Sequence, residues 1–331
     1  NAQPYAQNDY GSVSEDVVSE FLILANDWDP DKDTLVPSFK AGGESLITSN
    51  GALVRMTSNS IIYDPRGSIN IKALPVGVEI LEQIDYSISD QNGATAEASL
   101  FVNVMGVNDA PIAVTDNLTT DEDSLLEIDV GSLIANDNDP DHDDNGSTLK
   151  IVGLSSPSEV EKYQPVEGGD AIDVVSLADH GLSGDEKILI SGHEGSPPLN
   201  GVYEVEVVNS KTFRIGNRYD VTSFEDGVSG QWSAINESND NVSSDNGVDI
   251  NLQVKSSPPK SFVIYDLDGV DFSDSTPFGS KTEDSFWYLV KDSHSEYGMG
   301  RVEIEIIGVN DQPIANHDPI LLGTFLGMME S

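Results

Sequence analysis

Four aspartates stand at alternate positions within seven residues, directly after the apolar stretch 21–24. They are Asp27, Asp29, Asp31 and Asp33. Carboxylates at that density repel one another strongly unless a cation lies among them. Calcium suits such a cluster because it takes about six to eight oxygen ligands in irregular geometry, whereas magnesium demands an octahedron and zinc prefers nitrogen and sulfur. The turn therefore predicts a calcium site, although Asp31 and Asp33 also suit the solvated end of a turn.

This acidic turn is one of three sequence blocks that occur twice in the same order. The copies span 9–16 and 116–123, then 25–33 and 135–143, and finally 106–111 and 308–313. The spacing between copies is 110 residues at Asn26 and Asn136 but 202 residues at Asn108 and Asn310. The second copy is therefore longer by 92 residues, which predicts an insertion at 157–245.

The elements that must position these blocks are strands. Apolar and charged residues alternate over 301–306, the period expected of a sheet with one wet face. Turn signals such as Asn50-Gly51 and Asn246-Gly247 punctuate the chain at short intervals, and no segment keeps a helical period. Short strands and about 110 residues per copy predict an all-β chain of tandem antiparallel β-sandwiches. The alternation over 201–208 predicts a small β-barrel or sandwich for the insertion.

The expected organisation has four parts. They are a sandwich over 5–110, a second sandwich from 111–156 plus 246–313, an inserted β module over 157–245, and the start of a further repeat or a tail over 314–331.

The blocks resemble the cadherin-like tandem repeats, of VCBS or tandem-repeat type, in large RTX-like bacterial surface adhesins. Those repeats carry an N-D-x-D-P-D-x-D turn, a D-x-F-x-Y-x-V-x-D strand and a V-N-D-x-P linker; the strand motif appears here at 284–292 and more loosely at 82–90. The resemblance covers 9–156 and 246–313. It implies Ig/cadherin-like sandwiches, an extracellular location, either on the bacterial cell surface or secreted, and a role in cell adhesion and biofilms.

The resemblance also implies calcium ligands, because cadherins hold calcium jointly between an early acidic residue, the linker and the next acidic turn. For the junction between the two copies it assigns Glu15, Asn108, Asp109, Asp137 and Asp139, with Glu82 as an addition from a motif that is not clearly recognisable. Junctions with preceding and following repeats would use Asp27, Asp29, Glu122, Asn310 and Asp311, and the two acidic turns add Asp31 and Asp141.

The inserted segment resembles a small β-barrel module that recurs in bacterial surface and phage tail proteins. The resemblance rests on residues 180–185, 188–192, 199–203 and 212–213. Both a spacer and a platform that presents a ligand fit this segment. The alternative function is therefore a ligand-binding chain whose inserted module recognises a glycan or protein at the cell surface.

Composition limits the other possibilities. With 58 acidic and 16 basic side chains, the net charge of −42 excludes nucleic acid as a partner and disfavours an anionic membrane. No cysteine is present, and the five histidines are scattered without a metalloprotease spacing. We therefore expect no enzyme activity and no membrane insertion, with calcium ions and neighbouring repeats as partners. A salt-adapted surface without specific ions is the remaining explanation of the acidity.

Overall fold

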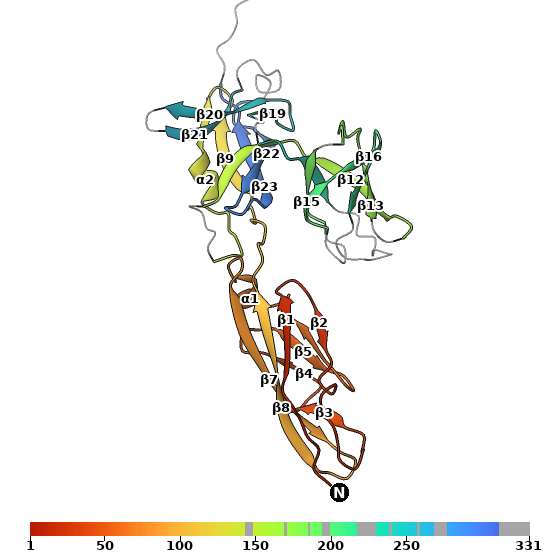
Figure 1. Cartoon of the computed structure of the whole chain (residues 1–331). Coiled ribbons are helices and arrows are strands. Elements are labelled where there is room, and N and C mark those ends of the chain that lie inside the picture. The colour runs from red at the N-terminus through yellow and green to blue at the C-terminus, as the bar shows by residue number, and fades with distance from the viewer. Residues whose placement is uncertain are drawn as a thin grey trace, which may run out of the picture.

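A computed structural model of the chain describes residues 1–142, 148–168, 171–184, 186–193, 199–216, 230–237, 240–256, 259–267 and 277–310. Almost all of its regular structure is strand, and it gathers around three separate hydrophobic clusters (Figure 1). The predicted all-β class of tandem Ig/cadherin-like sandwiches is confirmed.

The first sandwich consists of two four-stranded sheets. One sheet has the order β1-β8-β7-β3, with β1 (Asp9–Ser14), β3 (Val36–Phe39), β7 (Glu79–Ser89) and β8 (Thr95–Met105). The other has the order β2-β6-β5-β4, with β2 (Ser19–Phe21), β4 (Ser45–Ile47), β5 (Leu53–Met56) and β6 (Ile61–Asp64). Their inward residues, among them Ile84, Tyr86 and Ile88 of β7, form one core. The alternation along β7 matches a strand with one wet face.

One pairing in this sandwich is parallel. β1 runs beside β8 from Asp9 opposite Leu100 to Ser14 opposite Met105. The first and last strands of the sandwich are thus direct neighbours, and the residue that follows β1 lies at the point where the chain leaves β8.

A short helix, α1 (Ile69–Lys72), lies at the same end of the sandwich as that exit (Figure 1). The Ile71 N–H donates to Ser68 Oγ at 3.2 Å, which caps the helix, and Ile71 is fully buried. Anchored in this way, the helix carries Lys72 in its last turn toward the linker.

The second sandwich repeats this plan. One sheet has the order β11-β22-β23-β9, with β9 (Asp116–Asp121), β11 (Lys150–Ser155), β22 (Lys281–Lys291) and β23 (Tyr297–Ile307). The other has the order β10-β21-β20-β19, with β10 (Leu126–Asp129), β19 (Asn241–Ser243), β20 (Asp249–Ser256) and β21 (Pro259–Tyr265). A helix α2 (Val130–Ile134) follows β10, and β9 again runs parallel to the last strand, β23.

Between β11 and β19 the chain leaves this sandwich and forms a seven-stranded antiparallel sheet, which we call the inserted module. Its order is β15-β14-β18-β12-β13-β17-β16. The strands are β12 (Ser158–Pro165), β13 (Ala171–Ser176), β14 (Lys187–Ser191), β15 (Gly201–Glu204), β16 (Glu206–Asn209), β17 (Thr212–Gly216) and β18 (Gln231–Ala234). The edge strands β15 and β16 are consecutive along the chain, with only the buried Val205 between them in sequence. The module encloses its own core.

The domain boundaries expected from the sequence stay a prediction. Asp311 and the tail expected over 314–331 lie outside the described residues. Within the described part of the chain, the helices are too short to cross a membrane.

Candidate metal centre

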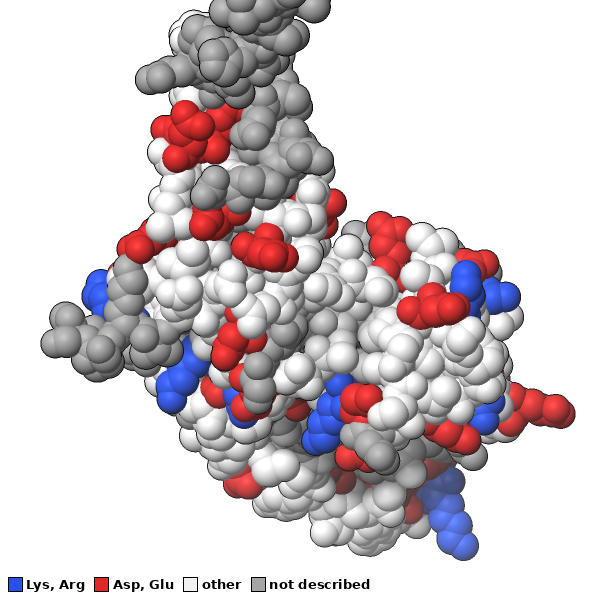
Figure 2. Space-filling model, turned by 90° about the horizontal axis from the view of Figure 1, so that it is seen from above, with Lys and Arg blue, Asp and Glu red and all other residues white. Residues whose placement is uncertain are grey.

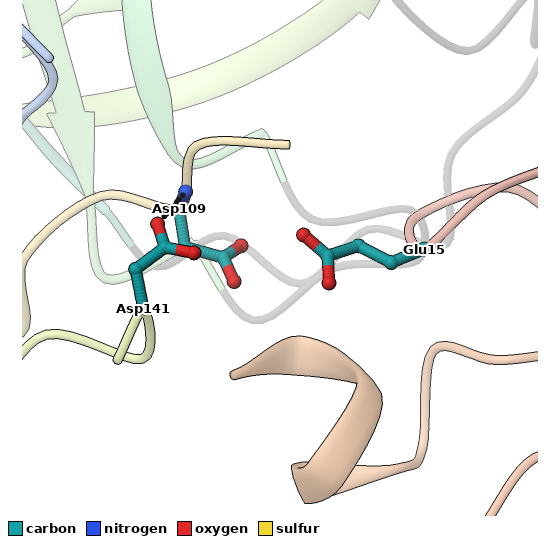
Figure 3. Close-up of side chains that lie close together, drawn as sticks. All are labelled: Glu15, Asp109 and Asp141. Carbon is teal, nitrogen blue, oxygen red and sulfur yellow. Dashed lines mark hydrogen bonds between the residues drawn. The ribbon is translucent and has the colours of Figure 1, made fainter. Parts of the chain in front are cut away.

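Three carboxylates meet where the first sandwich passes into the second. One oxygen from each of Glu15, Asp109 and Asp141 lies within 4.8 Å of the other two. Figure 3 shows Glu15 reaching from the first sandwich toward Asp109 and Asp141. Glu15 follows β1, Asp109 belongs to the linker between β8 and β9, and Asp141 belongs to the second acidic turn. The site therefore combines both sandwiches and the segment between them.

Glu15 is held by the exit of the first sandwich. Its backbone N–H donates to the Met105 carbonyl at 3.1 Å, and its Oε1 accepts the Val107 N–H at 2.8 Å. The residue has an exposed fraction of 0%, and its Oε2 has no hydrogen-bond partner. Burial raises the pKa of Glu15 from 4.5 to about 7, because exclusion of water disfavours the charged carboxylate. A buried oxygen in this condition calls for a proton or a cation.

Asp109 and Asp141 are fixed to each other. The Asp109 N–H donates to Asp141 Oδ2 at 2.9 Å, so a hydrogen bond joins the acidic turn to the linker. Asp141 is buried, and its own N–H donates to Oδ1 of the buried Asp139 at 3.0 Å. Asp109 Oδ2 is buried without a hydrogen-bond partner, and burial raises the pKa of Asp109. Asp139 thus shapes the turn that delivers Asp141.

Asn108 offers an amide oxygen, and its contacts identify Asp292, a residue that was not among the ligands expected from the sequence. Its Nδ2 donates to Asp292 Oδ2 at 2.7 Å, while its Oδ1 is buried and has no hydrogen-bond partner. Asp292 Oδ1 accepts the backbone N–H groups of His294 and Glu296 at 2.8 and 2.9 Å. Asp292 is the last aspartate of the D-x-F-x-Y-x-V-x-D strand, so the motif contained the signal for this contact.

A cation of the protein itself also reaches the junction. Lys72 Nζ lies 2.7 Å from Asp109 Oδ1 and also contacts Asp16. Its side chain is 27% exposed. Lys72 therefore cancels one charge at the edge of the site, while Glu15 Oε2 and Asp109 Oδ2 still have no hydrogen-bond partner. No sequence motif pointed to this residue, because a four-residue helix has no recognisable period.

Two expected ligands, Asp27 and Asp137, are instead used inside their own sandwiches. Asp137 Oδ1 accepts the Val114 N–H at 2.8 Å, and its Oδ2 lies 3.2 Å from the Tyr288 hydroxyl. Asp27 makes the matching contacts in the first sandwich, to the Gln7 N–H at 2.7 Å and the Tyr86 hydroxyl at 3.4 Å. Both carboxylates thus tie the acidic turn to a core tyrosine, and the structure does not bring either into the cluster.

The same tyrosines contact the first block of each repeat. Tyr86 donates to Asp9 at 2.7 Å, and Tyr288 lies 3.3 Å from Asp116 Oδ2. Burial raises the pKa of Asp116 from 3.8 to about 6, with the nearby charge of Asp137 as a smaller cause in the same direction. The aspartate that opens the first block of each repeat therefore serves the fold of its sandwich.

Glu82 is likewise placed elsewhere. It is buried between the sheets of the first sandwich, where its Oε1 accepts from Asn50 Nδ2. Its counterpart in the second sandwich, Asp284, accepts from the Tyr265 hydroxyl at 2.6 Å and the Asn246 N–H at 3.0 Å. Both carboxylates anchor an Asn-Gly turn to the long hairpin, so Glu82 does not join the junction.

The ends of the two sandwiches that face away from the junction, which we call the outer poles, repeat parts of it. At the first pole, Asp29, Asp31 and Asp33 form a second group of carboxylates, and the Ala2 N–H donates to Asp31 Oδ2 at 2.6 Å, as Asp109 does to Asp141. At the other pole, Oε1 of the buried Glu122 accepts the Val309 N–H at 2.6 Å, next to Asn310. Each pole thus contains one half of the arrangement that the junction assembles.

The donors at the junction fit calcium. Glu15, Asp109 and Asp141 supply hard carboxylate oxygens, and Asn108 supplies an amide oxygen, which are the ligand types that calcium takes. Three of these residues hold a buried oxygen without a hydrogen-bond partner, namely Glu15, Asn108 and Asp109. A cation among the carboxylates would satisfy the oxygens of Glu15 and Asp109, and the lack of a nitrogen or sulfur donor in this cluster, among the residues that the structure describes, disfavours zinc.

Acidic groups are not confined to this junction. Figure 2 shows Asp and Glu side chains spread over the visible faces of the second sandwich and the module. The net charge of −42 therefore has two parts, one dispersed over the surface and one buried between the sandwiches.

The sequence pattern of the bacterial Ig domain family matches residues 1–103 and 108–190. The chain therefore belongs to the bacterial Ig domain family. The second match continues past β11 into β12, β13 and β14 of the module, whereas the second sandwich is completed by β19 to β23. No curated protein matches the chain.

Solved structures of tandem cadherin domains are similar to it at low identity. Human mucin-like protocadherin EC1-2 matches with a TM-score of 0.30 and 14% identity, covering 93% of this chain and 100% of that one. Mouse protocadherin-24 EC1-3 matches with a TM-score of 0.26 and 10% identity, covering 92% and 70%.

Proposed function

We propose that this chain is a calcium-stiffened extender segment of a bacterial extracellular adhesin, without catalytic activity. The observation that carries the proposal is the buried Glu15, whose Oε2 has no hydrogen-bond partner and whose carboxylate lies close to two carboxylates of the linker and the next sandwich. Membership of the bacterial Ig domain family supports a structural role outside the cell.

Calcium would act at this junction by joining parts that otherwise repel. Glu15 belongs to the first sandwich, Asp141 to the second and Asp109 to the linker, so one ion would restrain all three. It would also offset the repulsion among their charges, which burial makes more costly than in water. The two sandwiches would then lose their freedom to bend about the linker.

The test is a calcium titration by calorimetry on chain treated with a chelator, together with small-angle scattering in calcium and in chelator. We expect calcium to bind, to raise the melting temperature and to narrow the range of angles between the sandwiches, while magnesium binds far more weakly. Glu15→Gln should weaken binding. Glu44→Gln, which neutralises an exposed acid of the same sandwich, should leave it unchanged.

Two results would count against the proposal. One is a chain whose melting curve and scattering do not change on chelation. The other is full replacement of calcium by concentrated sodium or potassium, which would indicate a salt-adapted surface without specific sites.

A further inference from the structure

The long hairpins of the two sandwiches can be compared residue by residue, because a constant offset of 202 relates β7–β8 to β22–β23. On the outer face of β7–β8, Asp85 stands opposite Ser99 and Ser87 stands opposite Glu97. At the same places in β22–β23, Trp287 stands opposite Arg301 and Leu289 stands opposite Met299. At these two places, four polar residues of the first sandwich are replaced in the second by three apolar residues and Arg301.

Two leucines show that this face is covered. Leu289 has an exposed fraction of 0% although it lies outside the core of its sandwich, to which its neighbours Tyr288 and Val290 belong. Strand alternation therefore turns Leu289 outward. In the module, Leu189 is 2% exposed while Ile188 and Ile190 fill the core. Leu189 must also point away from its own core and yet be shielded from water.

The module contacts the sandwich at the strand paired with that of Leu289. β14 and β15 lie against β23. The hydroxyls of Ser155, which ends β11, and Ser233, in β18, are 2.7 Å apart and buried, and Ser155 Oγ is 3.5 Å from Met299 Sδ.

The return segment after the module is tied down as well. Glu237 lies 2.7 Å from Lys291 Nζ and also accepts from the Tyr297 hydroxyl. Lys291 and Tyr297 stand opposite each other near the turn of the β22–β23 hairpin.

We propose that the outer face of β22–β23 is a docking surface for the inserted module. The contact between them, which includes Leu189, Leu289 and Met299 and which we call the seam, holds module and second sandwich together as one rigid body. The module is therefore carried at a fixed angle to the sandwich and does not swing on its two connecting segments. This inference is independent of calcium, because none of the seam residues belongs to the junction.

The experiment measures a distance between spin labels, which is straightforward because the chain has no cysteine. Cysteines replace the exposed Ser132 of the second sandwich and Glu161 of the module in the full chain. Double electron–electron resonance should give a narrow distance distribution. Leu289→Ser with Met299→Glu, the residues present at the matched places of the first sandwich, should at least double its width.

Leu189→Ser alters the module side of the same contact and should broaden the distance distribution in the same way. If the hairpin variant loses its circular dichroism and so fails to fold, the result for Leu189→Ser decides the test. Ser87→Ala with Glu97→Gln in the first sandwich is the matched control and should change nothing. A broad distribution in the unaltered chain would overturn the proposal. A distribution that stays narrow in the seam variants would overturn it equally.

Discussion

Replacing Glu15 by glutamine should have opposite effects with and without calcium. Glutamine keeps the size of the side chain and an Oε1 that accepts the Val107 N–H, and its amide can donate to the nearby Asp109 Oδ2, which has no hydrogen-bond partner. The substitution therefore removes one negative charge with little change in shape. Any large effect must come from electrostatics.

Without calcium, the variant should be more stable at alkaline pH. A pKa raised from 4.5 to about 7 means that the ionised Glu15 is unfavourable in the folded chain by up to about 3 kcal/mol, at about 1.4 kcal/mol per unit. This cost is fully present above pH 7, falls as pH drops through that value and vanishes below 4.5, where both states are protonated. We expect Glu15→Gln to gain about 2 kcal/mol at pH 8 and nothing at pH 4.

With calcium, the same variant should lose affinity. Removing one partner of a buried charge pair costs about 2–5 kcal/mol, so an increase of about 100-fold in the dissociation constant is expected. Calorimetric melting at pH 8 in chelator and in calcium measures both effects on one sample. A variant that melts lower than the unaltered chain in chelator would refute the electrostatic reasoning, and one that binds calcium unchanged would remove Glu15 from the site.

Three other substitutions test separate parts of the structure. Lys72→Gln should lower stability in chelator but raise calcium affinity by about tenfold in a calorimetric titration, because the ammonium on Asp109 Oδ1 repels an ion bound by the same carboxylate; unchanged affinity would contradict this. Ionised Asp116 disfavours the fold, so the melting temperature of the metal-free chain should rise as pH falls from about 6 to 4 and protonates it. Asp116→Asn should make this rise smaller, and a variant with the same pH profile as the unaltered chain would argue against this role. Gly300→Ala should cost about 2–4 kcal/mol in urea unfolding, because its Cβ would enter the ring of the buried Tyr288, whereas Gly67→Ala meets no neighbouring atom and should cost little; equal costs would refute the packing argument.

The sequence repeat predicted the sandwiches, and it located the junction in the chain. It could not decide which acidic residues face the ion. Asp137, Asp139 and Asp141 are spaced by two, and such spacing gives all three the same apparent orientation. The choice depends on distant partners, because the Tyr288 hydroxyl and the Val114 N–H take Asp137 while the Asp109 N–H takes Asp141.

Glu82 and Lys72 illustrate two further limits. Glu82 follows the strand pattern of β7 in which every second residue is buried, but only the position of Asn50 explains why a carboxylate is tolerated there. Lys72 reaches the linker because α1 is capped and anchored by Ile71, and this packing has no signature in a four-residue segment.

The parallel pairing of first and last strands has a mechanical consequence. Tension along the chain pulls the start of β1 and the end of β8 in opposite directions, so their hydrogen bonds are sheared together and do not open one at a time. β9 and β23 bear load in the same way in the second sandwich. The chain enters the module after β11 and returns to the second sandwich at β19, so the module lies outside the pairing of β9 with β23. Force on a pulled chain therefore passes through that pairing and not through the module. A cargo on the module would be carried without being stretched.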